Sequence, residues 1–312
     1  MGIIKSLALQ VPQIRDIWEQ RNKAMAERDA LRGEVANLDR DARIGRPLSE
    51  VINVNRYKDP EWLDIHRRVA EYSTDKHVFF DHAGHIVRKG WEWTQCIYGL
   101  ERLDMIKEGH SALGVGSGRE PISFYLADRI GKVVATDLYG NETWTNSNGA
   151  EAPADIVEDA TKYCPRPYRA DRLSFQNADG TNLPYADESF DFCWTISSIE
   201  HFGGHGAAAQ SMREMARVTK PGGIVSVVTE YVLLPEISHP EYFNRSQIEE
   251  HLIGATDDLQ LVDGMNWDVP PTEYLVDQIA LGTEGVHRTR RHVVLNDGFC
   301  QFTSFILFLR KR

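Results

Sequence analysis

Residues 111–137 constrain the fold of this 312-residue chain more than any other segment, because a glycine-rich turn separates two short apolar runs there. Gly114, Gly116 and Gly118 have no Cβ, so the backbone can turn sharply and approach a ligand closely. The helical segment that follows directs its first N–H groups toward whatever lies in the turn. Asp137 ends the second run, where a carboxylate can accept hydrogen bonds from two ribose hydroxyls. The segment therefore predicts one half of a nucleotide-binding β-α-β unit.

From residue 111 onward, strand-length apolar runs alternate with amphipathic helical segments. We expect strands at 111–115, 133–137, 173–177, 190–196 and 224–230, and helices at 121–130 and 207–218. This alternation is typical of an α/β fold with a mostly parallel sheet and helices on both faces. Two further strand-like runs are joined by Asn296-Asp297-Gly298, which is a hairpin signal. The last strand should therefore run antiparallel to its neighbour.

Four motifs follow the predicted strands in order, namely Gly114–Gly118, Asp137, Asn177–Gly180 and Ile196–Phe202. The carboxyl ends of parallel strands meet at one edge of an open sheet, where such sheets bind ligands. With the run VTKPGGIVSVVTEY leading into the fifth strand, this order resembles the class I S-adenosylmethionine-dependent methyltransferases, of the small-molecule, type-11-like group. The resemblance covers about two-thirds of the chain. It implies a Rossmann-like sheet of seven strands with an antiparallel last strand.

The resemblance also implies S-adenosylmethionine as the cofactor and assigns its binding to residues that follow the strands: Gly114, Gly116, Gly118, Asp137, Leu138, Asp179, Gly180 and Ser197. In the family, the glycines pass under the methionine and ribose, and the acid after the second strand holds the ribose hydroxyls. The residue after that acid lies against the adenine. The acid after the third strand accepts from the adenine N6 amine, and the tip of the fourth strand lies near the methionine part.

Ala112 departs from the family pattern, because an acid that helps hold the methionine end usually stands two residues before the first glycine. Glu120, just after the last glycine, begins the next helical segment and can supply that carboxylate. We expect Glu120 to contact the amino group of the cofactor, directly or through water. Arg119 stands where a dinucleotide fingerprint needs its third glycine, so an NAD-binding oxidoreductase ranks well below a methyltransferase.

His201 and Glu200 follow the predicted fourth strand at the same edge of the sheet. An imidazole titrates near neutral pH, so His201 is the first candidate for the base that removes a proton from an acceptor hydroxyl. Glu200 beside it could orient the ring or serve as the base itself. The alternative is that His201 is structural and packs near the start of the following helix.

Residues 1–90 are expected to form a helical N-terminal extension, followed by the methyltransferase domain at 91–312. Within 11–43, apolar residues recur at helical spacings among many charges. Two interpretations stay open for this segment. It could be a short coiled coil that joins two copies of the chain in a homodimer, or a single amphipathic helix.

Composition excludes several other classes of protein. A net charge of −11 without a long basic run argues against nucleic-acid binding. The four cysteines are widely spaced, and no segment reads as a signal peptide or a membrane span, so we expect a cytoplasmic protein with reduced thiols. His77, His82 and His85 have spacings that fit no familiar metal site, so no metal is assigned and a loop over the cofactor cleft is at least as good an interpretation.

The sequence thus predicts a methyltransferase acting on a small-molecule or glycan acceptor, with O-methylation of a sugar or surface glycan favoured. The favoured acceptor depends on residues 139–171, which mix aromatic, acidic and amide side chains suited to a polyhydroxylated molecule. The same side chains suit a solvated lid nearly as well. Whether oxygen, nitrogen or carbon is methylated stays open. The alternative from another class is a catalytically inactive cofactor-binding scaffold, or an assembly partner that acts through the N-terminal helix.

Overall fold

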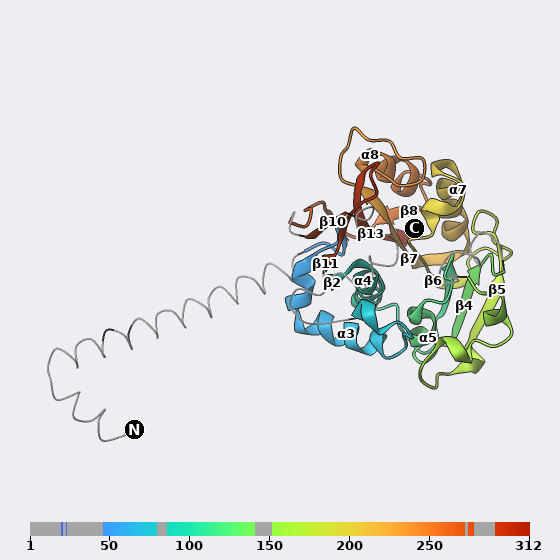
Figure 1. Cartoon of the computed structure of the whole chain (residues 1–312). Coiled ribbons are helices and arrows are strands. Elements are labelled where there is room, and N and C mark those ends of the chain that lie inside the picture. Colours follow the sequence, from blue (N-terminus) through green and yellow to red (C-terminus); the bar gives the residue numbers. More distant parts are fainter. Residues whose placement is uncertain are drawn as a thin grey trace, which may run out of the picture. The chain divides into compact units, whose positions relative to one another are not determined.

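The computed structural model describes residues 46–79, 86–140, 152–271, 274–277 and 291–312, together with positions 20 and 23. Its contacts divide the chain into two units, Met1–Arg46 and Pro47–Arg312. The second unit contains the sheet and the site described below (Figure 1). Most of the predicted coiled coil at 11–43 lies outside the described residues, and its dimerisation stays a prediction.

Five parallel strands form the centre of the sheet. Across the sheet they follow the order β5 (Leu173–Asn177), β4 (Lys132–Asp137), β3 (Ser111–Val115), β6 (Phe190–Ile196) and β7 (Thr219–Val232). The chain runs outward from β3 to β5 and then returns to β6 beside β3, so the strand order reverses between β3 and β6. A crevice at the carboxyl ends of the strands is expected at such a reversal.

The C-terminal strands confirm the predicted hairpin. Strand β13 (Gln301–Lys311) pairs antiparallel with β7, and β12 (Val294–Asn296) pairs antiparallel with β13. With the five parallel strands they form the expected Rossmann-like arrangement of seven strands. Four short strands extend it to eleven: β1 (Ser49–Val51), β8 (Leu259–Leu261), β9 (Met265–Asn266) and β10 (Leu275–Asp277).

Helices cover both faces of this sheet (Figure 1). Helix α5 (Pro121–Ala127) connects β3 to β4, and α7 (His205–Val218) connects β6 to β7 in the opposite direction across the sheet. Because crossovers between parallel strands are right-handed, the two helices lie on opposite faces. Helix α4 (Arg88–Arg102) packs against β6, β7 and β13, and α3 (Pro60–Ala70) packs on α4.

Shorter elements complete the described chain: η1 (Val54–Lys58), η2 (Lys76–Phe79), β2 (Ile86–Val87), η3 (Ala154–Val157), η4 (Thr161–Tyr163), η5 (Ala170–Arg172), η6 (Ile199–His201), α8 (Arg245–Gln247), η7 (Ile248–Ile253) and β11 (Arg291–His292). Strand β2, which leads directly into α4, pairs with β11 in a separate two-stranded sheet.

The central strands form because their apolar runs are buried on both faces of the sheet. In β3, residues 112–115 are all buried, and β6 buries every residue except Asp191. Near-continuous apolar runs of this kind are typical of parallel strands covered by helices on both sides. Phe192 and Trp194 are fully buried, and a side chain of this kind stabilises the fold by roughly 2 kcal/mol.

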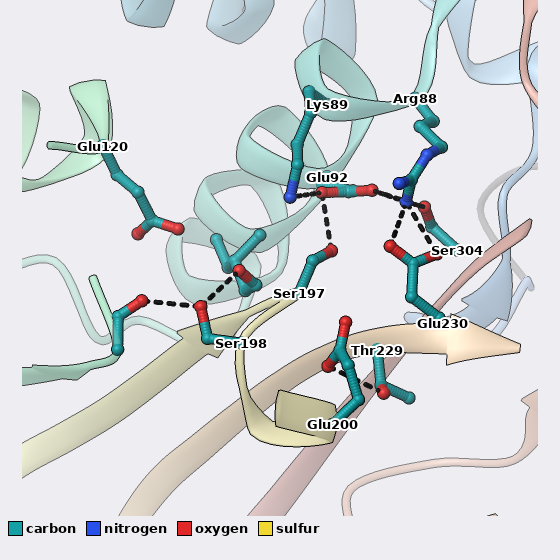
Figure 2. A network of polar contacts seen from close by, with 12 residues as sticks. Arg88, Lys89, Glu92, Glu120, Ser197, Ser198, Glu200, Thr229, Glu230 and Ser304 are labelled. Carbon is teal, nitrogen blue, oxygen red and sulfur yellow. Dashed lines mark hydrogen bonds and ion pairs between the residues drawn. The ribbon is translucent and has the colours of Figure 1, made fainter. Parts of the chain in front are cut away.

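The position of α4 depends on one close contact with the sheet. A Cβ on Gly99 would lie 2.1 Å from Cζ of Phe308 in β13, so only glycine permits this approach. The approach holds α4 against the sheet while its first turn, with Arg88 and Lys89, reaches the carboxyl ends of β6 and β7 (Figure 2). A larger residue at position 99 would displace that turn.

The structure departs from the sequence prediction at the fifth strand, which we expected over 224–230, after Pro221-Gly222-Gly223. Strand β7 already begins at Thr219, and these residues form an irregularity in its pairing with β6. Gly222 has a φ of +82°, which favours glycine. The strand therefore bulges instead of turning.

The compact unit begins at Pro47, before the predicted domain boundary at residue 90. Strand β1 pairs with β13, and α3 packs on α4, so the segment 47–90 shares the core of the larger unit. The division at residue 90 stays a prediction of where the common methyltransferase fold begins.

Candidate active site

A cavity of about 310 Å³ opens at the carboxyl ends of β3, β4, β5 and β6. Its volume lies at the lower end of the range that small-molecule sites occupy. The cavity brings together nine of the residues that the sequence assigned to the site: Gly116, Gly118, Glu120, Asp137, Leu138, Asp179, Gly180, Ser197 and His201. Gly114 and Glu200 are not among the described residues that line it.

The glycine-rich turn forms one wall of the cavity. Gly116 has a φ of +65° and Gly118 a φ of +48°, so the backbone adopts the left-handed region there. Gly114 has a different part, because it lies within β3, and a Cβ on it would lie 2.4 Å from Cζ2 of Trp194. Gly114 thus leaves room for the Trp194 ring, and the next two glycines present the backbone to the cavity.

Asp137 is held at the tip of β4 by two backbone groups. Its Oδ2 accepts from the N–H of Gly118 at 2.8 Å, and its Oδ1 accepts from the N–H of Leu138 at 2.7 Å. A carboxylate offers about four acceptor positions, so the same group can hold the turn and accept from a ligand hydroxyl. Leu138 beside it is 44% exposed and presents an apolar surface to the cavity, as a flat aromatic base would require.

Asp179 and Gly180 form a turn after β5. The Oδ1 of Asp179 accepts from the N–H and the hydroxyl of Thr181, at 2.8 and 2.7 Å. A Cβ on Gly180 would lie 2.6 Å from Cε2 of Phe202, so the ring and the turn meet closely. The turn therefore carries an exposed carboxylate at the β5 end of the cavity.

Ser197 lies at the tip of β6 with a φ of +47°, which is unusual for a residue with a side chain. Its hydroxyl donates to Oε2 of Glu92 at 3.0 Å, and its N–H donates to the carbonyl of Val228. The neighbouring Ser198 donates to the carbonyl of Gly116 at 2.7 Å and so ties this tip to the glycine turn. Backbone strain of this kind is concentrated at functional sites.

Glu120 occupies the N-cap position of α5 but makes no side-chain cap bond. Instead, its Oε2 accepts from Nε1 of Trp194 at 3.1 Å. Burial raises the pKa of Glu120 to about 8, and the charges of Glu92 and Asp137 add to this, while the Trp194 bond and Lys89 oppose it. A neutral carboxyl group therefore faces the cavity near pH 7.

His201 lines the cavity and has a carboxylate partner that the sequence did not suggest. Its Nδ1 lies 3.1 Å from Oε2 of Glu241, a residue forty positions later in the chain. Glu200 lies elsewhere, fully buried, with its Oε2 accepting from the Thr229 hydroxyl at 3.1 Å. Burial, together with the charge of Glu230, raises the pKa of Glu200 to about 8. Of the two predicted catalytic residues, only His201 is on the cavity wall.

A buried charge network lies beside the tip of β6 (Figure 2). Lys89 lines the cavity, and its Nζ lies 3.1 Å from Oε2 of Glu92. Arg88 bonds to Glu92 at 3.0 Å and to Glu230, and the Ser304 hydroxyl donates to Glu92. Burial by itself would raise the pKa of Glu92, but Lys89 and Arg88 hold it below its usual range, at about 2. Glu92 is therefore ionised and links two cations.

This network was not predicted from the sequence. The only signal in the sequence was the spacing of Arg88, Lys89 and Glu92, which places two cations three and four positions before an acid. On a helix that pattern is usually a solvent-exposed ion pair. Glu230 and Ser304 come from strands far away in the sequence, so only the fold brings them together.

The described residues from 152 to 171 contribute little to the cavity. Ala152 lines it, but Tyr168 packs edge-on against Phe124, and Tyr163 bonds to Asp155. Trp144 lies outside the described residues. The aromatic residues of this segment that the structure describes thus serve packing rather than the cavity.

No group of three or more histidine, cysteine or acidic side chains is arranged to hold a metal ion among the residues that the structure describes. His82 and His85 lie outside those residues. Within the same described part of the chain, no helix combines the length and apolar character needed to cross a membrane.

The known proteins that are similar to this chain are methyltransferases, which fits a cofactor site in this cavity. Residues 113–227 match the family model of a methyltransferase domain. Methyltransferase GfsG of Streptomyces halstedii is 35% identical over 142 residues, which cover 46% of this chain and 44% of that protein. The ubiquinone/menaquinone biosynthesis C-methyltransferase UbiE of Bdellovibrio bacteriovorus is 45% identical over 56 residues, 18% of this chain and 23% of that protein.

A third relative, 27-O-demethylrifamycin SV methyltransferase of Amycolatopsis mediterranei, is 37% identical over 73 residues, 22% of this chain and 25% of that protein. The chain spans less than half the length of these curated relatives. The matched domain contains the glycine turn, both acids and the β6 tip. Residues 113–227 therefore form a methyltransferase domain of the class I S-adenosylmethionine-dependent type, with S-adenosylmethionine as its cofactor.

Proposed function

We propose that this protein transfers the methyl group of S-adenosylmethionine to a hydroxyl oxygen of a small-molecule acceptor, with sugars and surface glycans as the favoured class. One observation carries the choice of a hydroxyl: His201 lies on the cavity wall with its ring held by Glu241 at 3.1 Å. A hydroxyl must lose its proton during methylation, and an imidazole oriented by a carboxylate is suited to accept it.

The β4 and β5 end of the cavity fits the adenosine part of the cofactor. Asp137 is fixed by backbone donors and, in this proposal, accepts from the ribose hydroxyls. Leu138 offers the exposed apolar surface on which an adenine can pack. Asp179, with Gly180 beside it, would accept from the N6 amine.

The β3 and β6 end fits the methionine part. Gly116 and Gly118 leave the turn open for close approach, and Ser197 lies at the opposite strand tip. We propose that Glu120 holds the amino group, because an arriving ammonium would favour the ionised form of a carboxyl that burial keeps neutral. Gly114 acts indirectly, by making room for the Trp194 ring that holds Glu120.

In the proposed reaction, His201 accepts the proton of the acceptor hydroxyl on its Nε2 while Glu241 stabilises the imidazolium through Nδ1. When bound, the cofactor would supply the methyl group of its sulfonium to the acceptor oxygen and would keep the electron pair of the sulfur–methyl bond, leaving as S-adenosylhomocysteine. Positioning of the acceptor supplies a large part of the rate in such a displacement. Glu200 was the second candidate for the base from its position beside His201, but it is fully buried and is not among the described residues that line the cavity.

The names of the relatives fit a small-molecule acceptor but differ in the atom that is methylated. UbiE is named as a C-methyltransferase, and the Amycolatopsis mediterranei protein is named for a 27-O-demethyl acceptor. The oriented His201 supports an acceptor that loses a proton during the reaction, and for this chain we propose oxygen as the methylated atom.

The test incubates the protein with S-adenosylmethionine and a panel of sugars, glycans and small hydroxylated metabolites. We expect one acceptor class to gain the mass of one methylene group, with stoichiometric S-adenosylhomocysteine. His201→Ala should lower kcat by about 100-fold or more while the cofactor Kd changes little. His110→Ala is the control, because His110 precedes the amino end of β3 and bonds to the Met105 carbonyl, away from the cavity. Unchanged kcat in His201→Ala would refute the role of His201, and an absence of methylation across the panel would favour the inactive scaffold.

We also propose, from the sequence pattern of residues 11–43, that two copies of the chain associate. Light scattering of the full chain should give the mass of a dimer, and deletion of residues 1–43 should give a monomer. A monomeric full chain would contradict the coiled coil.

A cytoplasmic location is proposed from the thiols. All four cysteines, Cys96, Cys164, Cys193 and Cys300, are buried and free, which fits a reducing compartment. Fractionation of cells that make the protein should recover it in the cytoplasmic fraction, and recovery outside that fraction would contradict the proposal.

A further inference from the structure

We propose that Lys89 binds the α-carboxylate at the methionine end of the cofactor and, with Glu120, recognises the zwitterionic amino-acid group. This inference rests on the proposed function, because it names a residue for the same cavity. Lys89 lies outside the matched methyltransferase domain, which begins at residue 113. It is the second residue of α4 and lines the cavity.

Strand order places Lys89 at the methionine end. Glu120 follows β3, Ser197 follows β6, and these strands are neighbours, whereas Asp137 and Asp179 follow β4 and β5. Lys89 shares Oε2 of Glu92 with Ser197, so its ammonium group lies beside the β6 tip. In Figure 2, Lys89 comes from α4 and Glu120 from the start of α5, and both reach toward that tip.

The charge balance at this end requires a cation for a bound carboxylate. Glu92 is fully buried and ionised, and Glu120 lines the same end of the cavity. A ligand carboxylate placed near the ionised Glu92 would be repelled unless a positive group lay between them. Lys89 is the cation in that position, with 24% of its side chain exposed. A lysine ammonium has three N–H donors, so it can hold Glu92 and a ligand carboxylate together.

The surrounding network fixes Lys89 in place. Glu92 is bonded by Arg88, Ser197 and Ser304, and Arg88 is bonded in turn to Glu230. A lysine that is oriented before binding loses less conformational entropy when the ligand arrives. In this proposal the network contributes to cofactor binding as well as to the fold, because it orients the ammonium group of Lys89 at the cavity wall.

The test is isothermal titration calorimetry of the full chain with two ligands. S-adenosylmethionine carries the carboxylate, and decarboxylated S-adenosylmethionine lacks it but is otherwise the same. Lys89→Met should weaken binding of S-adenosylmethionine by about 10- to 100-fold and leave the affinity for the decarboxylated ligand within a few-fold of wild type. The control Lys132→Met removes an exposed lysine at the amino end of β4 and should change neither affinity.

Each outcome decides the proposal. If Lys89→Met loses affinity for both ligands equally, or for neither, the role of Lys89 is overturned while the cofactor assignment stands. A variant that fails to fold loses both ligands, so Lys89→Arg is titrated beside it and should retain most of the affinity for S-adenosylmethionine. If the wild-type chain binds neither ligand, the proposed function fails, and the role of Lys89 fails with it.

Discussion

The two ends of the cavity recognise a ligand by different physical means. At the β4 and β5 end, Asp179 is oriented by Thr181, two positions along the chain. Asp137 is oriented by Leu138 beside it and by Gly118, nineteen positions earlier in the same β-α-β unit. At the β3 and β6 end, Arg88 of α4 and the Ser304 hydroxyl of β13 bond to the buried Glu92, and Arg88 also bonds to Glu230 of β7. One turn and one β-α-β unit suffice for the first end, whereas the second depends on contacts between elements far apart in the sequence.

The difference has an energetic consequence. An exposed carboxylate in a turn is solvated in either state of the chain, so its removal changes stability little. A buried carboxylate that links two cations is different, because its removal leaves uncompensated charges in the protein interior. Substitutions at the methionine end should therefore lower the stability of the whole domain as well as cofactor binding, whereas substitutions at the adenosine end should mainly lower binding.

The largest expected effect is on stability. Glu92→Ala should lower the free energy of unfolding by about 3–5 kcal/mol, because Lys89 and Arg88 lose their shared partner. Asp179→Ala, at the other end, should cost less than about 1 kcal/mol. Urea unfolding of both variants measures the two values. Equal losses in the free energy of unfolding would contradict the distinction between the two ends of the cavity.

The next effect is on affinity at the adenosine end. Asp137→Asn should weaken binding of S-adenosylmethionine by about 30- to 100-fold, because a charged acceptor for the ribose hydroxyls is lost. Binding of 5′-methylthioadenosine, which has the same ribose but no amino-acid group, should weaken by a similar factor. Calorimetry with both ligands checks this. If only the binding of S-adenosylmethionine weakened, Asp137 would contact the methionine part of the cofactor and not its ribose.

A third effect concerns pH. The folded pKa of Glu120 is raised to about 8, so its contribution to stability is present below the unfolded pKa and is lost as pH rises through about 8. Glu120→Gln cannot ionise and should lose about 2 kcal/mol less stability than wild type between pH 6 and pH 9. Denaturant unfolding at both pH values measures this difference. Parallel pH profiles for the two proteins would show that Glu120 is ionised in the folded state.

The smallest effect tests the apolar surface for the adenine. Leu138→Ser should weaken cofactor binding by about fivefold, since part of the apolar contact area is lost. Val157→Ser is the matched control, because Val157 is 42% exposed but does not line the cavity. Equal affinities for the two variants would argue against adenine packing on Leu138.

The adenosine end was predictable because its residues directly follow strands. Strand β3 was predicted with its observed bounds, and so were β5 and β6. Since parallel strands end at one edge, Asp137, Asp179 and Ser197 had to lie close together once the strands were known. Here the order of motifs along the chain was enough.

The remaining residues could not be predicted, because they come together only through long-range packing. Lys89 reaches the cavity because Gly99 lets α4 lie close to β13, and nothing in the local sequence predicts that contact. Glu241 meets His201 across forty positions. Glu200 follows the same strand as His201, yet it faces the interior instead of the cavity, and a run of adjacent polar residues does not reveal which one faces inward.

The most direct measurement compares two ligands on the wild-type chain as pH changes. S-adenosylmethionine and 5′-methylthioadenosine are titrated by calorimetry between about pH 6 and pH 7.5, below the range in which an α-amino group itself titrates. Because the ammonium must ionise Glu120, affinity for S-adenosylmethionine should rise about tenfold or more with release of a proton, while the affinity for 5′-methylthioadenosine stays constant. The same pH dependence for both ligands, or none for S-adenosylmethionine, would contradict the division of the cavity into two ends.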